Sequence, residues 1–484
     1  MGPAPAAPFF VMPPIRSDLL SGEPPGLRGG RATQPGAGGA GGSEREPWAD
    51  VPAILARIPA LGFPDRDFVV TDFGATGDGR TDVQAALQRA IVACSQAGGG
   101  RVVVPPGDYL TGPLVLESHV NLHVEAGAAL RFTTDSCRYF PAVLTRWEGV
   151  ECMGPAPFLY APHRHHLAVT GAGTLDGQAG PGQWWDWAGP WDGVEATGWR
   201  EGQPDQRAAR RRMQAWGEAG APVEQRVLAA DDRIRPMFLE FLRCHDVLVE
   251  GVTLRNLPMW GVHPVQSRAV TVRGVRVISH GPNNDGCVPD SSRDVLVEDC
   301  TFDTGDDCIA IKSGRNGDGR RVGVPAEDIV IRGCRMGEGH SGVAIGSEIS
   351  GDVRRVFIER CAMNSAHLDQ ALRIKGNSAR GGTVEQIRLR DVEVGRVREG
   401  AVAVDLCYDQ NEERGEFPPT VRDVLIERLT CEQSGRAIWI EGLPSRPVSA
   451  VRISDCRFRR VAAENVLRHV DDFAASRTTF PAPA

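Results

Sequence analysis

Residues 295–312 read VLVEDCTFDTGDDCIAIK, in which two short runs of alternating aliphatic residues flank a polar turn. The first run has the pattern aliphatic-x-aliphatic-x-x-(Val, Cys or Leu), which recurs at irregular intervals through the second half of the chain. Constant short strands separated by loops of variable length are typical of a solenoid of stacked coils. The other copies are VLVEGV (247–252), VTVRGV (270–275), IVIRGC (329–334), VFIERC (356–361), IRLRDV (387–392), LIERL (425–429) and VRISDC (451–456).

The second run of the opening stretch, CIAIK (308–312), also has counterparts further along the chain. Because side chains alternate between the two faces of a strand, Ile309 and Ile311 are predicted to point inward and Lys312 outward. Short strands stacked coil on coil, with loops at fixed edges, predict an all-β fold, a right-handed parallel β-helix. The counterparts are GVAIG (342–346), ALRIK (371–375), AVAVD (401–405) and AIWIE (437–441).

Several of the twelve cysteines occupy one position of this repeat. Cys300, Cys334, Cys361 and Cys456 stand where other copies carry Val or Leu. A cysteine that exchanges with those residues behaves as a small buried hydrophobe. Disulfides between stacked coils are the alternative, and buried thiols are favoured over them.

The flanks of the repeat differ from it in composition. Residues 1–46 contain ten glycines and eight prolines, which predicts a disordered tail. Residues 81–84 (TDVQ) form a capping box before an apolar helical face, which predicts a helix that caps the open N-terminal end of the solenoid. The other expected segments are one β-helix domain over 47–465, a Trp- and Arg-rich insertion within it over 178–232, and a C-terminal tail over 466–484.

Charge and hydropathy exclude two classes of partner. The 484 residues include 54 basic and 62 acidic side chains, a net charge of −8, so the chain lacks the basic footprint of a nucleic-acid binder. No apolar run approaches the ~20 residues needed to span a bilayer. The opening MGPAPAAPFFVMPPIR also lacks the charged start and continuous apolar stretch of a secretory signal. We therefore expect no nucleic acid and no membrane as a partner.

Polar groups gather at two positions of the second strand set. Acids and a histidine recur three residues before the first inward residue, and cations recur on the outward face. Since neighbouring coils lie about 4.8 Å apart, these two columns are predicted to line one groove. The first column holds Asp285 (counted from Val288), Asp306, His340 and Asp369, and the second holds Lys312, Arg373 and Lys375.

The acids of this groove suit one kind of chemistry. Asp306 and Asp307 are adjacent, and Asp285 is predicted beside them; crowded carboxylates raise one another's pKa, so that one stays protonated while another remains a base. Hydrolysis of a glycosidic bond needs such a pair, and groups one or two coils apart suit the inverting separation of about 6.5–9.5 Å. Arg373 and Lys375 suit a substrate carboxylate, so the expected ligand is an anionic sugar chain.

Four motifs follow one another in these coils, namely Asn283-Asn284-Asp285, Gly305-Asp306-Asp307, Gly339-His340 and Arg373-Ile374-Lys375. In this order and spacing they resemble glycoside hydrolase family 28, the polygalacturonases and their relatives. The front of the chain, VTDFGATGDGRTD (70–82) with GGGRVVVPPGDYLTGPL (98–114), is similar to the opening of pectin-degrading β-helices. The resemblance spans residues 66–460. It departs from the family at Ser341, which stands where a glycine often follows the histidine directly.

The resemblance implies a role for each site residue. Asp306 is the expected general acid, Asp285 and Asp307 are expected to activate the attacking water, and His340 is expected to tune the acid. Asn283 is expected to orient the site. Arg373 and Lys375 are expected to bind the galacturonate carboxylate. Lys312 is either a further substrate contact or a partner of a neighbouring acid, and Tyr408 is assigned to substrate stacking by position alone.

The implied activity is inverting hydrolysis of α-linked galacturonate in pectin or its oligosaccharides, by a polygalacturonase that acts at chain ends. The form of the motifs GDDCIAIKSGRNGDG (305–319) and GVAIGSE (342–348) favours the exo-acting branch. The insertion 178–232 is expected either to wall off one end of the groove or to serve only in packing. We expect no cofactor, and no residues have a recognised metal-ligand spacing.

Other functions stay open on sequence alone. Rhamnogalacturonan or xylogalacturonan fragments are alternative substrates. A calcium-dependent pectate lyase and a non-catalytic carbohydrate-binding β-helix are alternative classes, although the acids match the hydrolase motifs. A polymer substrate suggests an extracellular or periplasmic location, whereas no export signal is legible. The sequence contains no indication of the oligomeric state.

Overall fold

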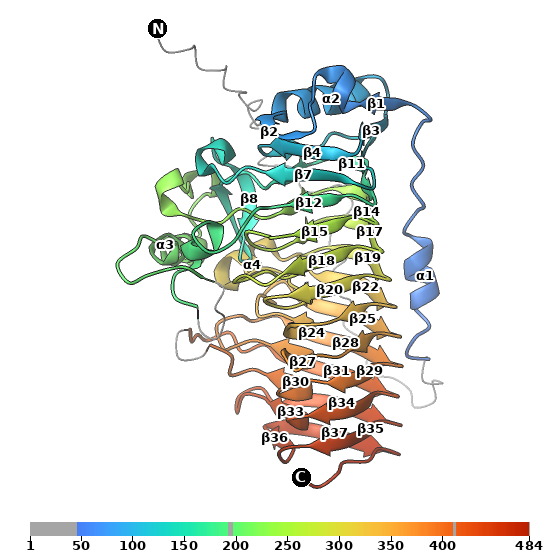
Figure 1. Ribbon diagram of the computed structural model, residues 1–484. Helices are drawn as coiled ribbons and strands as arrows, with labels where there is room; N and C mark the ends of the chain where they lie inside the picture. Colours follow the sequence, from blue (N-terminus) through green and yellow to red (C-terminus); the bar gives the residue numbers. More distant parts are fainter. Residues whose placement is uncertain (1–45, 192–196, 410–412, 484) are drawn as a thin grey trace, which may run out of the picture.

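The structure is a computed structural model that describes residues 46–191, 197–409 and 413–483. Its strands stack coil upon coil into a right-handed parallel β-helix, as predicted from the repeat (Figure 1). The predicted tail over 1–46 lies outside the described residues except for Glu46. None of the helices within the described ranges has the length and apolarity needed to span a bilayer.

Three sheets run along the solenoid, and the first repeat of the sequence forms the largest of them. This 13-stranded parallel sheet contains β1 (Asp67–Val69), β3 (Gly100–Val104), β6 (Val120–Val124), β11 (His165–Gly171), β14 (His245–Glu250), β17 (Arg268–Arg273), β19 (Arg293–Glu298), β22 (Ala326–Arg332), β25 (Val353–Glu359), β28 (Thr383–Arg390), β31 (Thr420–Glu427), β34 (Val448–Ser454) and β37 (Val470–Ser476).

The second sheet follows the first around each coil. It has 12 strands, namely β2 (Asp78–Asp82), β4 (Gly107–Thr111), β7 (Ala128–Phe132), β12 (Thr174–Asp176), β15 (Thr253–Arg255), β18 (Arg276–Ser279), β20 (Thr301–Thr304), β23 (Arg335–Met336), β26 (Ala362–Met363), β29 (Glu393–Arg396), β32 (Thr430–Ser434) and β35 (Arg457–Val461).

The third side of the solenoid contains the second strand set and is interrupted once. One part has β5 (Leu114–Val115), β10 (Leu159–Pro162), β13 (Leu239–Leu242) and β16 (Val262–Val265). The other has β21 (Ile309–Ile311), β24 (Gly339–Ile345), β27 (Leu368–Lys375), β30 (Gly400–Asp405), β33 (Arg436–Glu441) and β36 (Val466–Arg468). Single bridges at Cys287 and Asp290 join the two parts, so the coil that contains Asp285 has no full strand here.

The predicted inward positions form the core. Ile309, Val343 and Leu372 are in register on neighbouring strands, and all three are fully buried. The cysteines of the repeat position are buried thiols that pack among them. Val288 departs from the prediction, because Cys287 is the inward residue of that coil and Val288 packs on the outside beneath the covering segments.

Helix α2 (Gln84–Gln96) covers the N-terminal end of the solenoid, as predicted (Figure 1). Its buried face includes Leu87, Ile91 and Cys94. The predicted capping box does not form, because the Asp82 carboxylate accepts the N–H of Gln84 at 2.9 Å while the Thr81 hydroxyl donates to Asp78. A short Asx-type contact therefore starts the helix.

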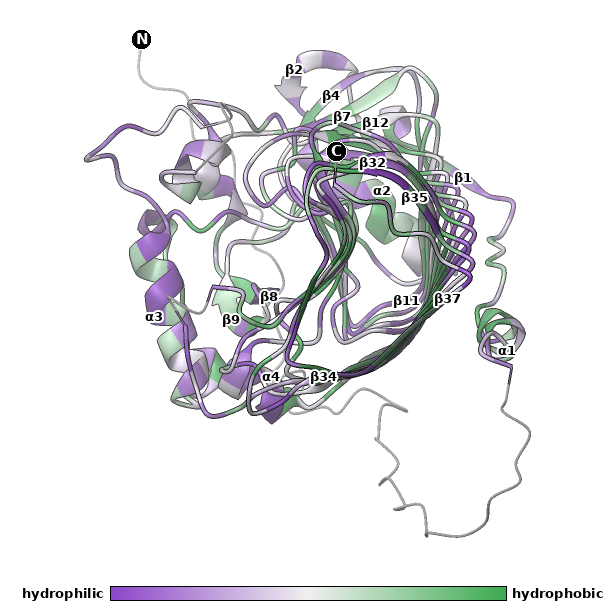
Figure 2. Ribbon diagram, turned by 90° about the horizontal axis from the view of Figure 1, so that it is seen from below, coloured by the Kyte–Doolittle hydropathy of each residue, from purple (hydrophilic) through white to green (hydrophobic). Residues whose placement is uncertain are grey.

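Helix α1 (Val51–Ala56) lies against the outer face of the first sheet (Figures 1 and 2). Trp48, Val51 and Ile54 pack there on apolar residues that point outward from β19, β22 and β25. These outward residues are Leu296, Val330 and Phe357. The segment before the first coil thus covers an apolar stripe that the solenoid itself leaves uncovered.

The C-terminal segment differs from the predicted tail over 466–484. Residues 466–476 form β36 and β37, which pair in parallel with β33 and β34. Phe473 packs against the core of this last coil. Charged residues on the outward face, such as Asp471 and Asp472, hide the alternating pattern that marks the other coils.

The opposite side of the solenoid is covered by a hairpin and the predicted insertion (Figure 2). The hairpin consists of β8 (Val143–Trp147) and β9 (Val150–Gly154), the one antiparallel pair in the described sheets. It packs with α3 (Arg207–Glu218) and α4 (Asn316–Val322) around a second apolar cluster. The short 3-10 helices are η2 (Val70–Phe73), η3 (Ser136–Tyr139), η4 (Trp184–Ala188), η5 (Val223–Gln225) and η6 (Ala230–Asp232).

Candidate active site

Two successive turns before the third sheet bring the predicted acids together. Oxygen atoms of Asp285, Asp306 and Asp307 all lie within 4.8 Å of one another. The N–H of Gly286 donates to the carbonyl of Asp307 at 3.0 Å, so Asp285 is in register with Asp307. The sequence analysis counted back from Val288 and placed Asp285 beside Asp306, which is wrong by one residue. The acids are therefore closer together than the wide separation expected from the sequence.

The three carboxyl groups are buried and differ in their electrostatics. Burial, together with the charge of Asp306, raises the pKa of Asp285 well above its usual value. Burial also acts to raise the pKa of Asp306, but the charge and hydrogen bond of His340 outweigh it and hold that pKa well below its usual range. Asp307 accepts a hydrogen bond from Lys375 Nζ at 2.8 Å. In this state the proton that the cluster retains belongs on Asp285.

His340 lies directly beside the acid cluster. Its Nδ1 is 3.1 Å from Oδ1 of Asp306. The Asp306 charge raises the pKa of His340 to about 9, against the opposing effect of burial. The imidazole is therefore protonated at neutral pH and places a proton within reach of Asp306.

The predicted cations lie in the same place, but two of them are not solvent-facing. Lys312 and Lys375 are only 4% and 6% exposed; Trp260 and Glu348 lie against Lys312, and Tyr408 and Asp307 lie against Lys375. Lys312 Nζ donates to Glu348 at 2.9 Å and lies 3.9 Å from Asp285. This favours the second interpretation of Lys312, the partner of neighbouring acids.

Arg373 and Tyr408 form one wall of the site. The Arg373 guanidinium lies 5.0 Å from the centre of the Tyr408 ring, and Lys375 Nζ lies 5.2 Å from it. Among the polar atoms that the structure describes, Arg373 Nε is buried without a hydrogen-bond partner. The guanidinium therefore retains capacity to bind an anion.

Asn283 is placed by a residue that the sequence analysis missed. Its Nδ2 lies 3.5 Å from Asp306, and its Oδ1 accepts a hydrogen bond from Arg235 at 2.6 Å. Burial lowers the pKa of Arg235 to about 10. Arg235 comes three residues after the insertion 178–232, so no motif spacing points to it. Asp369, the next member of the acid column, instead forms an ion pair with Arg398 at 2.8 Å.

A pocket of about 220 Å³ opens above these groups, and covering segments close one side of it. Glu148, at the tip of the β8–β9 hairpin, accepts a hydrogen bond from Arg210 Nε of α3 at 2.6 Å. The Trp191 ring is parallel to the His340 ring, with centroids 6.4 Å apart. Arg315 lies 3.8 Å from Glu148 and 3.4 Å from Glu348. The further lining residues that were not predicted as site residues are Glu148, Trp191, Arg210, Trp260, Arg315, Ser347, Glu348 and Asp409.

Sequence comparisons agree with this site. The profile described as glycosyl hydrolases family 28 matches residues 215–470, which contain all the predicted site residues. A second profile, described as rhamnogalacturonase A/epimerase, pectate lyase-like, matches residues 68–130 in the first coils. The family profile spans more than half of the chain.

Three relatives illustrate the similarity. A probable polygalacturonase of Vitis vinifera is 29% identical over 402 residues, 80% of this chain and 73% of the relative. An exo-poly-alpha-D-galacturonosidase of Dickeya chrysanthemi is 26% identical over 404 residues, 78% of this chain and 65% of the relative. The crystal structure of a hyperthermoactive exopolygalacturonase from Thermotoga maritima is 41% identical, with a TM-score of 0.85 over 89% of this chain and 96% of that one. The chain therefore belongs to glycosyl hydrolase family 28 and is a glycoside hydrolase with a parallel β-helix fold.

Proposed function

We propose that the protein is an exo-acting polygalacturonase, which hydrolyses the terminal α-linked galacturonate of pectic chains or their oligosaccharides. The observation that supports it most is the cluster of Asp285, Asp306 and Asp307 in a pocket that Glu148 of the hairpin and Arg210 of α3 also line. The relatives named as exo-acting enzymes, one of them 41% identical, support the same substrate and mode of attack.

Asp306 acts as the general acid in this proposal. The leaving oxygen needs a proton, whereas the charges around Asp306 favour its carboxylate form in the free enzyme. His340 Nδ1, at 3.1 Å, is protonated and supplies that proton through Asp306 as charge develops on the leaving oxygen. His340 is then the proton donor behind the acid.

Asp285 and Asp307 activate the attacking water. They are in register on adjacent coils, so one water can hydrogen-bond to both carboxyl groups and donate to the Asp307 carboxylate. Asp307 accepts the hydrogen bond of Lys375 Nζ at 2.8 Å, and this carboxylate is the stronger candidate for the base. A spacing below about 5.5 Å is by itself typical of retaining enzymes. Two carboxylates facing one water favour inversion instead, and we propose an inverting reaction.

Arg373 holds the substrate carboxylate. Its buried Nε has a hydrogen bond to give, and Tyr408 supports the guanidinium face. Lys375 is already bound to Asp307 and contributes charge at a greater distance. Asp405, at 3.9 Å, is the ion-pair partner that the structure gives Arg373, and a neutral sugar would leave the Arg373 Nε–H without an acceptor, so the pocket favours a uronate.

The closed side of the pocket accounts for exo action. Glu148, Arg210 and Trp191 come from the hairpin and the insertion, and they occupy the space that a continuing chain needs beyond the terminal sugar. We propose that this wall limits the product to monogalacturonate.

Product analysis on polygalacturonic acid tests the proposal, with chromatography of early products and NMR of the first anomer released. Release of monogalacturonate as the inverted anomer is expected from the unchanged protein. A ladder of oligomers would contradict exo action, and the retained anomer would contradict the role of two acids on one water. Unsaturated ends absorbing in the ultraviolet would contradict hydrolysis itself.

A further inference from the structure

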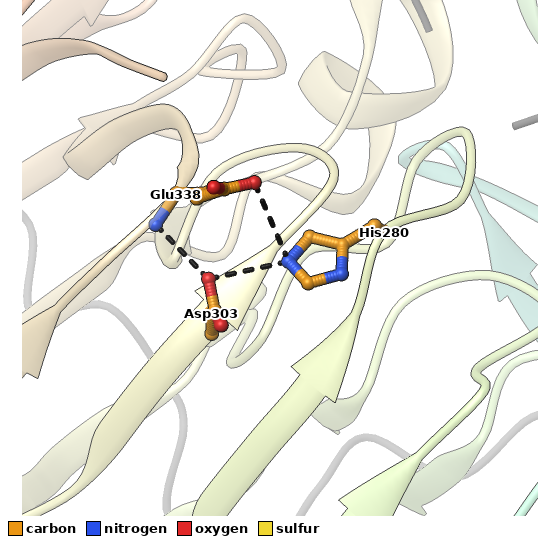
Figure 3. A group of neighbouring side chains, drawn as sticks. All are labelled: His280, Asp303 and Glu338. Carbon is orange, nitrogen blue, oxygen red and sulfur yellow. Dashed lines mark hydrogen bonds and ion pairs between the residues drawn. The ribbon is translucent and has the colours of Figure 1, made fainter. Parts of the chain in front are cut away.

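Three side chains outside the pocket converge from three successive coils (Figure 3). His280 follows β18, Asp303 lies in β20, and Glu338 follows β23. His280 Nε2 lies 3.2 Å from Asp303 Oδ1 and 3.7 Å from Glu338 Oε2, and one ligand atom from each residue lies within 4.8 Å of the others. Figure 3 shows both carboxylates pointing at the same ring nitrogen.

In the part of the chain that the structure describes, the two carboxylates of this triad lack the arginine partners that carboxylates have elsewhere on the solenoid. Ladder carboxylates such as Glu298 and Glu359 pair with arginines on neighbouring strands. Within the described residues neither Asp303 nor Glu338 forms an ion pair with an arginine or lysine, and both share the single imidazole of His280. All three side chains are 41–45% exposed, so an ion can reach them from solvent.

We propose that His280, Asp303 and Glu338 bind a divalent transition-metal ion, with Zn²⁺ the best fit. Zn²⁺ takes imidazole nitrogen and carboxylate oxygen at about 2.0–2.2 Å, which puts two ligands roughly 3.0–3.6 Å apart. His280 Nε2 lies 3.2 Å from Asp303 Oδ1 and 3.7 Å from Glu338 Oε2, so only small side-chain shifts bring these ligand atoms into that range. Ca²⁺ and Mg²⁺ prefer sets of oxygen ligands alone, so the imidazole favours Zn²⁺. Water completes the coordination.

The place of the triad gives the ion a structural effect. Asp303 precedes Asp306 by three residues, and Glu338 precedes His340 by two. An ion held by all three side chains links the starts of the turns that position the acids and the imidazole. The other carboxylate cluster, Asp285 with Asp306 and Asp307, already has Lys375 and Lys312 as counter-charges and is the poorer cation site.

Calorimetric titration of the untagged full chain with ZnCl₂ tests the site, with Co²⁺ absorption in the visible range as a spectroscopic readout. One site is expected, weakened about tenfold or more by His280→Ala and by Glu338→Gln. The exposed His469, on the last coil, gives the matched control: His469→Asn is expected to bind as the unchanged protein does. Glu338→Gln keeps the side-chain volume and tests the site even if His280→Ala does not fold.

Three results would overturn this inference. One is Zn²⁺ binding that survives His280→Ala and Glu338→Gln unchanged. Another is binding that Asp306→Asn abolishes, which would place the ion on the catalytic carboxylates. The third is the absence of saturable binding by folded protein at millimolar Zn²⁺. None of these results bears on hydrolysis of polygalacturonic acid, so this inference and the proposed function fail separately.

Discussion

Asp285 and Asp307 are in register on adjacent coils, joined by the hydrogen bond from Gly286 N–H to the Asp307 carbonyl at 3.0 Å. This relationship separates them from Asp306, which stands one residue earlier beside His340. In the proposed mechanism the three acids thus divide into a pair beside the attacking water and a single acid that has its own proton source. Mutations are expected to report the same division.

Asp306→Asn is expected to lower kcat on polygalacturonic acid by about 10²–10⁴-fold, because the leaving oxygen loses its proton donor. On a galacturonosyl fluoride, whose leaving group needs no proton, the same variant should lose far less. Asp307→Asn should be impaired equally on both substrates. Asp369→Asn is the matched control from two coils further on, expected to stay within tenfold of the unchanged protein since Asp369 pairs with Arg398. If Asp306→Asn were impaired equally on both substrates and Asp307→Asn lost far less on the fluoride, the two residues would have exchanged roles.

The pair of His340 and Asp306 predicts a pH-dependent stability. The pKa of His340 is raised from about 6.5 to about 9 in the folded protein. The ion pair of His340 with Asp306 therefore contributes its full stabilisation of the folded state below pH 6.5, and this contribution is lost as the pH rises through 9. His340→Gln should therefore lower the free energy of unfolding most near pH 6 and least above pH 9. Urea unfolding of both proteins at a series of pH values measures this. A difference that grows with pH would contradict the pairing.

The sequence predicts the fold and most of the site because both rest on short-range patterns. Alternation identifies the inward residues, and the four motifs identify acids, histidine and cations on successive coils. The error at Val288 shows the limit of this reasoning. Two adjacent small residues, Cys287 and Val288, fit the inward position equally well by type, and only the ladder shows which of them enters the core.

The missed residues come from contacts distant in sequence. Glu148 meets Arg210 across 62 residues, and Arg235 meets Asn283 across 48. No periodicity connects a hairpin tip or an insertion helix to a given coil, so packing alone determines which side chain enters the pocket.

Removal of the last coil is expected to lower the stability of the protein. A chain ending at Asn465 lacks β36 and β37, which uncovers the edges of β33 and β34 and the core that Phe473 protects. We expect a fall in Tm of about 5 °C or more and concentration-dependent aggregation, because a solenoid needs its terminal coil as a cap. A chain ending at Phe480 is the control and should melt as the full chain does. Equal Tm values for the two truncations would mean that residues 466–480 add nothing to stability.

The ion pair of Glu148 and Arg210 predicts a change in product length. Arg210→Ala removes the long side chain from the wall and leaves Glu148 without its closest partner, so the pocket extends beyond the terminal sugar. The variant should release digalacturonate as well as monomer, and its KM for longer chains should change more than kcat. Arg212→Ala is the matched control on the same helix, because Arg212 pairs with Asp232 away from the pocket at 2.6 Å. If Arg210→Ala still releases only monomer at the rate of the control, the ion pair of Glu148 and Arg210 does not set product length, and a boundary formed by Trp191 or Trp260 must do so instead.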